Sequence, residues 1–286
     1  MIPLRDENPT RKRSYITLGL ILTCFAVFGY ELFVQATGGD DALDDLVTAW
    51  GVVPDKVTAS LAAGQLISLA TLGLVTSLFL HASWLHVLGN MLYLWIFGNN
   101  IEDRFGHLRY LAFYLAAGIA AGLTQVAADP HSTVPLVGAS GAIAGLLGAY
   151  LVLYPGARIE SIVFLGFFYQ LLRVPAVIVL GFWFVLQLID GLTSIGSTAT
   201  SGGGVAVFAH IGGFGLGLLV GLAIRGAARV RRPAGGPAGA LPATAPGDGA
   251  TAVDGGPAGG PTGGPAAGPT GGPALGDGPP VGGGVG

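Results

Sequence analysis

Residues 81–106 read HASWLHVLGNMLYLWIFGNNIEDRFG, an apolar stretch with polar side chains near both of its ends. His86 and Asn90 lie near its start, one helical turn apart. The longer run Val57–Ile101 contains no Asp, Glu, Lys or Arg. About 20 apolar residues cross the hydrocarbon layer of a membrane as a helix. The stretch therefore predicts a membrane-spanning helix at Phe79–Asn99.

The composition of the whole chain is typical of a membrane protein. Of its 286 residues only 10% are charged, 51% are hydrophobic, and the mean hydropathy is +0.67. Soluble domains average about 25% charged residues, so these values exclude an ordinary soluble enzyme. No basic patch with interleaved aromatics occurs, so we expect no nucleic-acid partner. The single cysteine, Cys24, permits no intramolecular disulfide.

Six apolar stretches of near-spanning length predict an all-α, polytopic bundle of six transmembrane helices. They are Tyr15–Gln35, Phe79–Asn99, Tyr110–Ala128, Val134–Tyr154, Pro175–Leu192 and Val205–Ile224. The apolar run Ser161–Leu172 is too short to cross. With six spans every basic residue except Lys56 lies on one side, and basic residues favour the cytoplasm. We therefore expect both termini in the cytoplasm and a multi-pass protein of the plasma membrane.

The chain divides into three expected segments. Residues 1–14 form a cytoplasmic N-terminus and residues 15–224 form the membrane domain. Residues 225–286 combine a basic juxtamembrane segment with a Gly/Pro-rich tail, which is expected to be disordered because it offers nothing to bury. The first apolar run exceeds the core length of a signal peptide and is expected to remain as a helix. The long external segment from Ala36 to about Leu78 is partly apolar, which favours a position in the membrane interface.

Three polar side chains fall at a similar predicted depth on different spans. His86, Ser140 and His210 each lie five to seven residues past the outer end of their span, which is roughly 8–11 Å at 1.5 Å per residue. Asn90 shares a helical face with His86. Each residue alone has a purely structural explanation, such as a hydrogen bond between helices or a packed histidine. Their coincidence favours a site where Ser140 and His210 meet.

Small residues surround two of these positions. The sequence GASG occupies 138–141, and AHIGGFGLG occupies 209–217. Such residues let membrane helices approach closely, so Gly141, Gly213 and Gly217 have a packing explanation. Close approach is also what would bring His210 to Ser140.

Taken together, the run at 81–106, GASG at 138–141 and AHIGGFGLG at 209–217 resemble the rhomboid family of intramembrane serine proteases. The resemblance extends from about Ser77 to Gly221, with the motifs in the family's order. It implies an endopeptidase that cuts transmembrane proteins within the lipid bilayer and uses neither a cofactor nor a metal.

The resemblance also assigns roles to single residues. It implies that Ser140 is the nucleophile and His210 its general base. His86, Asn90 and the backbone N–H of Ser140 match the oxyanion hole, and Gly138 matches the position that leaves room beside the serine. Gly213 matches the small residue that contacts the fourth helix. Two further matches, Glu102 and Arg104, belong to a structural polar cluster.

One position departs from the family pattern, and other readings of the site remain open. Many relatives carry an aromatic residue four positions after the serine, where this chain has Ala144. Either another aromatic packs against His210 or that ring is held less firmly. A non-catalytic rhomboid-like protein that binds membrane helices is the main alternative. A metal site of His81, His86 and His210 is a weaker one, since the HExxH signature is absent. The sequence leaves the oligomeric state open.

Overall fold

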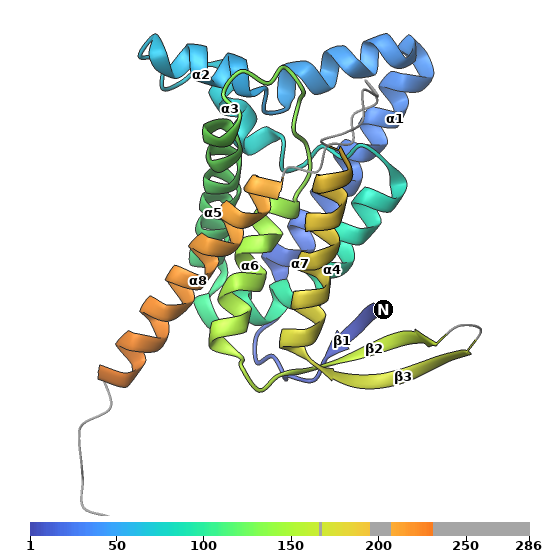
Figure 1. Cartoon of the computed structure of the whole chain (residues 1–286), viewed down its shortest axis with the longest axis vertical. Coiled ribbons are helices and arrows are strands. Elements are labelled where there is room, and N and C mark those ends of the chain that lie inside the picture. The colour runs from blue at the N-terminus through green and yellow to red at the C-terminus, as the bar shows by residue number, and fades with distance from the viewer. Residues whose placement is uncertain (166–167, 195–206, 231–286) are drawn as a thin grey trace, which may run out of the picture. The chain divides into compact units, whose positions relative to one another are not determined.

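A computed structural model describes residues 1–165, 168–194 and 207–230, all within one compact unit of the chain. Helices predominate (Figure 1). In chain order the elements are β1 (Ile2–Asp6), α1 (Tyr15–Trp50), α2 (Pro54–Ala62), α3 (Leu69–Thr76), α4 (Trp84–Phe105), α5 (His107–Ala128), α6 (Ser140–Leu153), β2 (Arg158–Leu165), β3 (Phe168–Pro175), α7 (Ala176–Ser194) and α8 (Val207–Val230). The Gly/Pro-rich tail and the predicted start of the sixth span at Val205 lie outside the described residues.

Among the described residues, three helices are long and apolar enough to cross a membrane: α1, α5 and the Val207–Ala227 part of α8. α6 is apolar but shorter, as is the Ala176–Gln187 part of α7. α4 has 22 residues and ends in a charged turn that contains Glu102 and Arg104. Each of these six helices covers most of one predicted span. The protein is therefore a membrane protein whose described part is largely helical and contains three helices that meet the length and composition criteria for spanning.

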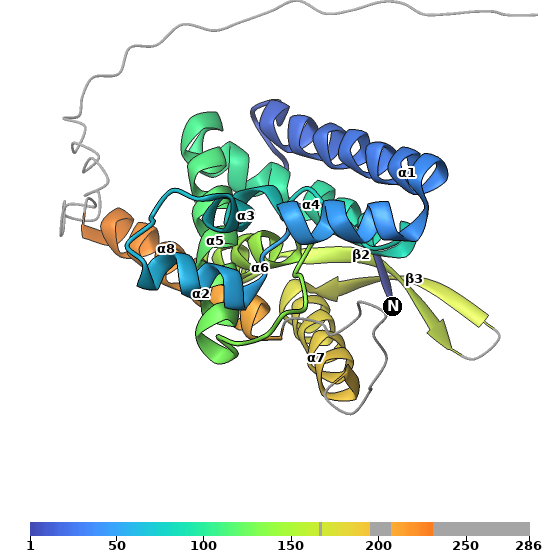
Figure 2. The same cartoon turned by 90° about the horizontal axis from the view of Figure 1, so that it is seen from above.

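The core of the bundle is built around α6. Nearly every residue of this helix is buried, and large side chains from α4 and α5 pack against it. α8 runs along another side of α6, and the turned view shows these helices grouped together (Figure 2). A helix that is apolar on all faces is expected at the centre of such a bundle.

The expected external segment, from Ala36 to about Leu78, is largely helical. α1 continues to Trp50, and only Gly39 interrupts it, with a φ of 79° that favours glycine. The second part of α1 and helix α2 lie across one end of the bundle, above α3 (Figure 1). Leu136 exchanges two backbone hydrogen bonds with Val52, which joins this segment to the chain just before α6.

A small antiparallel sheet corrects the all-α prediction. Its order is β1-β2-β3, and Ile2 pairs with Ile162 across most of the chain. The 12-residue apolar run that is too short to span lies mostly in the β2–β3 hairpin. β2 and β3 pair locally, but their apolar run has no alternation of apolar and polar residues to indicate strands, and the pairing of β1 with β2 is too distant in sequence to leave a local signal.

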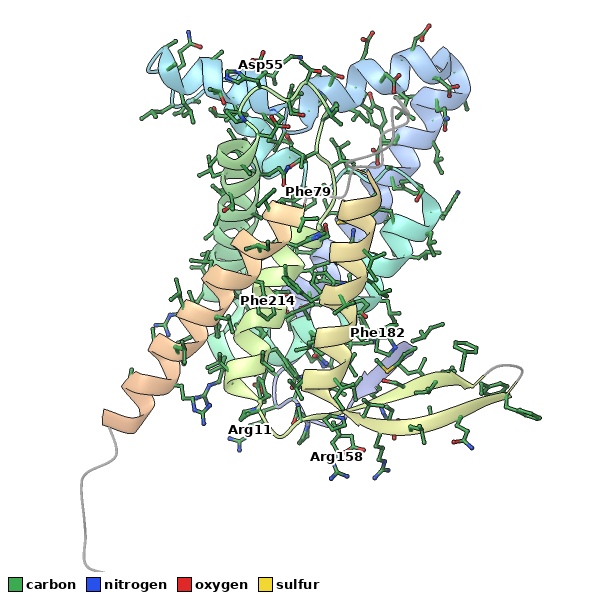
Figure 3. The ribbon with its side chains drawn as sticks, viewed as in Figure 1. Arg11, Asp55, Phe79, Arg158, Phe182 and Phe214 are labelled. Carbon is green, nitrogen blue, oxygen red and sulfur yellow. The ribbon has the colours of Figure 1, made fainter. Side chains whose placement is uncertain are left out.

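The two ends of the bundle differ in charge. Arg11 and Arg158 lie at the end that carries the sheet, whereas Asp55 lies at the opposite end with α2 (Figure 3). This is the separation of charge on which the predicted orientation depends.

Candidate active site

Ser140 is the first residue of α6. The backbone before it is held by a hydrogen bond from the Gly138 N–H to the Ser77 carbonyl, 2.8 Å. Gly138 has a φ of 123°, which a residue with a side chain rarely adopts. The start of α6 also shows that the predicted depth was wrong in detail, because residues 134–139 precede the helix instead of forming its first turns. Since Ala139 gives no side-chain cap, the first N–H groups of α6 remain available.

His210 lies in the first turn of α8 and meets Ser140 from the facing helix. Its Nε2 is 2.8 Å from the Ser140 Oγ, across 70 residues of sequence. The ring is almost completely buried, with 3% exposure, whereas Ser140 is half-buried. Gln125 on α5 supports this turn, because its Oε1 accepts a hydrogen bond of 3.3 Å from the Ala209 N–H.

Glycines allow the close approach of α8 to α6. A side chain at Gly213 would collide with the carbonyl oxygen of Gly141, and one at Gly217 would collide with that of Gly145. On the other side of α6, a Cβ at Gly141 would lie 2.6 Å from the Cβ of Ala121 on α5. The small residues at these positions therefore fix the distance between the helices that carry the serine and the histidine.

His86 and Asn90 approach the same place from α4. Ser83 caps this helix by accepting a hydrogen bond from the His86 N–H. A Cβ at Gly138 would lie 2.7 Å from His86 Nε2 and 3.7 Å from Asn90 Nδ2, so both side chains face the backbone just before Ser140. Asn90 is 8% exposed, and its Nδ2 has no hydrogen-bond partner among the described residues. Buried donors are normally paired, so the Asn90 Nδ2 group is available to donate a hydrogen bond to a further acceptor.

Trp183 on α7 packs against His210, which the sequence did not reveal. The ring centroids are 5.4 Å apart with an interplanar angle of 62°. Ala144 is fully buried one turn after the serine and offers no ring. Of the two alternatives raised by Ala144, the structure thus has another aromatic beside the histidine. His210 Nδ1 has no hydrogen-bond partner among the described residues, so packing orients the ring.

Glu31, a buried acidic residue near the site, was also not predicted from the sequence. Glu31 on α1 is buried, and its carboxylate accepts the backbone N–H of His81 at 3.1 and 3.2 Å. The His81 ring lies edge-on to His86, with centroids 5.2 Å apart. A single acidic residue in an apolar span was the available signal. Among the described residues no group of three or more His, Cys, Asp or Glu side chains could hold a metal ion.

Glu102 acts at the opposite end of α4, as a cap for another helix. Its carboxylate accepts the N–H groups of Ile16 and Thr17 and the Thr17 hydroxyl, at 2.7–2.9 Å. α1 has no side-chain cap of its own at Ser14, so these bonds supply one. Arg104 is exposed.

Asp6 anchors the sheet beneath the helices at this end. Its carboxylate accepts hydrogen bonds from Tyr150 on α6, at 2.9 Å, from Asn8 and from Asn100 on α4. Burial raises the pKa of Asp6 above its ordinary value, although these three bonds act in the opposite direction.

The structure is thus a helical membrane bundle in which the hydroxyl of Ser140 lies against the buried ring of His210. Residues 68–227, more than half of the chain, match the rhomboid domain. The chain therefore belongs to the rhomboid family.

Several curated relatives share part of this region. The chain is 42% identical over 78 residues to Rhomboid protease GluP of Bacillus subtilis (strain 168), which covers 27% of this chain and 15% of the relative. It is 38% identical over 78 residues to both RHOMBOID-like protein 5 of Arabidopsis thaliana and Putative rhomboid protease YdcA of Bacillus subtilis (strain 168). Those matches cover 27% of this chain and 25% and 39% of the relatives. The chain thus matches well under half of the length of each of these proteins.

Proposed function

We propose that this protein is an intramembrane serine endopeptidase that hydrolyses peptide bonds of transmembrane proteins. Ser140 is the nucleophile and His210 the general base. The observation that carries the proposal is the 2.8 Å separation of Ser140 Oγ and His210 Nε2 at the starts of two neighbouring helices. The protease names of two relatives agree with it.

The acylation step follows from these positions. With its proton on Nδ1, His210 accepts the Ser140 hydroxyl proton at Nε2 as the oxygen attacks the scissile carbonyl. The carbonyl oxygen becomes an oxyanion, which Asn90 Nδ2, His86 and the Ser140 N–H stabilise by hydrogen bonds. His210 then gives the proton to the leaving amine, and the serine ester remains.

Deacylation uses the same groups in reverse. A water molecule gives its proton to His210 while its oxygen attacks the ester, and the oxyanion forms again beside Asn90. The collapse of this intermediate releases the carboxyl product and returns the proton to Ser140. Since no carboxylate accepts from His210 Nδ1 among the described residues, Trp183 is the group that keeps the imidazole in place.

The location of the pair supports a membrane-protein substrate. Ser140 lies at the start of an apolar helix inside a membrane bundle, so the substrate has to present its peptide bond there. A helical substrate segment must unwind first, because helical hydrogen bonds and side chains shield its carbonyls. We assign six spans, with the basic end of the bundle in the cytoplasm and the protein in the cell membrane.

Co-expression with a tagged single-span membrane protein tests the proposal. The wild type should release a tagged fragment, whereas Ser140→Ala and His210→Ala should lose cleavage by a factor on the order of 10⁶. Ser60→Ala and His131→Ala are matched controls, because both residues lie on the external segments away from the pair, and they should cleave normally. Cleavage that survives in Ser140→Ala would refute the nucleophile. Binding of the substrate without any cleavage by the wild type would favour the helix-binding alternative.

A further inference from the structure

The outer half of the β2–β3 hairpin is an exposed apolar surface that the proposed catalysis does not use. From Ser161 to Leu172 the sequence has no charged residue. Phe168 is 77% exposed and Tyr169 72% exposed, and Phe164 and Leu171 are also exposed. An exposed apolar strand at the edge of a sheet promotes aggregation in water. Such a surface is therefore expected to be covered by another apolar surface.

Apolar side chains occupy both faces of this outer half. Cross-strand partners share a face, so the Phe164–Tyr169 and Ile162–Leu171 pairs cover one face. Phe168 lies on the other face, since successive residues alternate. Turning the hairpin therefore cannot hide its apolar side chains from water.

The inner half of the hairpin is polar by contrast. Glu160 and Arg173 are cross-strand partners. Arg5 on β1 bonds Glu160 at 3.0 Å, and Arg173 bonds Glu7 at 2.9 Å. Polarity thus changes along the length of the hairpin, from ion pairs beside the bundle to aromatic rings away from it.

The hairpin directly adjoins an apolar helix at one end of the bundle. β3 ends at Pro175 and α7 begins at Ala176, so no linker separates the sheet from the apolar helix. The hairpin extends sideways from the helices, across their direction (Figures 1 and 2). It leaves the bundle at the end that carries Arg11 and Arg158 (Figure 3).

We propose that the outer half of the β2–β3 hairpin lies in the lipid leaflet at the basic end of the bundle. Its aromatic residues suit the boundary between headgroups and acyl chains, where Phe and Tyr anchor interfacial segments. At this end of the bundle the exposed Arg158, at the start of β2, and the exposed Lys12, whose N–H bonds Asp103 of α4, attract anionic headgroups. Among the described residues β3 pairs only with β2, so its other edge keeps unpaired N–H and C=O groups. Unpaired backbone groups are costly in hydrocarbon, so this edge of β3 cannot lie at the centre of the bilayer. The hairpin therefore lies at the level of the headgroup boundary.

A fluorescent label at Gln170 measures this depth in the full-length protein. Gln170 is the polar residue of outer β3, and Cys24 is fully buried, so Gln170→Cys supplies the reactive thiol. The protein is reconstituted at one copy per vesicle, with anionic lipids that carry a nitroxide near the headgroup. Arg11→Cys serves as the water-exposed control, and Val177→Cys, at an exposed position of the apolar helix α7, serves as the lipid-facing control. Wild-type protein without an added cysteine corrects for labelling of Cys24.

The proposal predicts a blue-shifted emission at position 170, quenching by the shallow nitroxide and loss of quenching by aqueous iodide relative to position 11. Adding Phe168→Asp and Tyr169→Asp should restore iodide quenching, whereas Phe168→Leu with Tyr169→Phe should not. Iodide quenching as strong as at position 11 would overturn the proposal. Protection from iodide that appears only when several copies share a vesicle would overturn it too, in favour of pairing between two hairpins.

Discussion

Replacing Gly138 by alanine tests whether the space beside Ser140 matters for catalysis. The new Cβ would lie 2.7 Å from His86 Cε1 and Nε2, where ordinary contact begins at 3.4 Å, so the ring must move by about 0.7 Å. Loss of one oxyanion donor costs about 10²–10³ in kcat, and we expect a loss of this size for Gly138→Ala. The φ of 123° adds backbone strain of about 1–3 kcal/mol to the folded state.

The assay is cleavage of a single-span substrate in vesicles, with kcat and KM measured separately. Thermal unfolding and gel filtration show how much of the variant is folded, so that kcat refers to folded protein only. Gly156→Ala is the matched control, because a Cβ there meets nothing within 4 Å and the backbone has no positive φ. A folded Gly138→Ala protein with the wild-type kcat would refute the role given to His86 at this position.

Three further predictions concern Asn90, Trp183 and Asp6. Asn90→Ala removes the amide that we propose as an oxyanion donor, so kcat should fall about 10²–10³-fold with KM nearly unchanged in the same assay. Trp183→Ala frees the His210 ring and should lower kcat by about 10²-fold, the effect of a misplacement of about 1 Å. Trp183→Phe keeps a ring there and should recover much of that loss, so equal kcat values for the two variants would contradict the positioning role. The raised pKa of Asp6 means that its protonated form favours folding, so wild-type stability should fall as the pH rises from 3.8 through that pKa. Asp6→Asn should lose this pH dependence in thermal melts. A variant with the same pH profile as the wild type would contradict the assignment of the dependence to Asp6.

The sequence predicts the helical frame well, because apolar length is a local property. The helices α1, α4, α5, α6, α7 and α8 cover most of the six expected stretches. Helix starts are less predictable, as Ser140 shows. The apolar residues before it looked like helix, but Leu136 forms backbone hydrogen bonds with Val52, a distant residue that no periodicity identifies.

The site itself was predictable only where polarity stands out in an apolar setting. His86, Asn90, Ser140 and His210 were visible for this reason. Trp183 was not, because an aromatic residue in an apolar helix has no distinctive pattern until its neighbours are known. The sheet was missed for two reasons. The run Ser161–Leu172, which forms most of β2 and β3, is apolar without the alternation that marks a half-buried strand, and β1 pairs with β2 only through residues about 160 positions apart.

The bonds from Glu102 to the start of α1 have a consequence for biogenesis. The acceptor follows the N–H groups that it caps by 85 and 86 residues, so the ribosome makes α1 well before its cap exists. The first helix can enter the bilayer early, but the N–H groups at its N-terminal end have no cap until α4 has been synthesised and packed against it. A nascent chain stopped before Glu102 should therefore be cleaved by protease at residues 15–17. A longer chain that includes Glu102 should be protected from cleavage there.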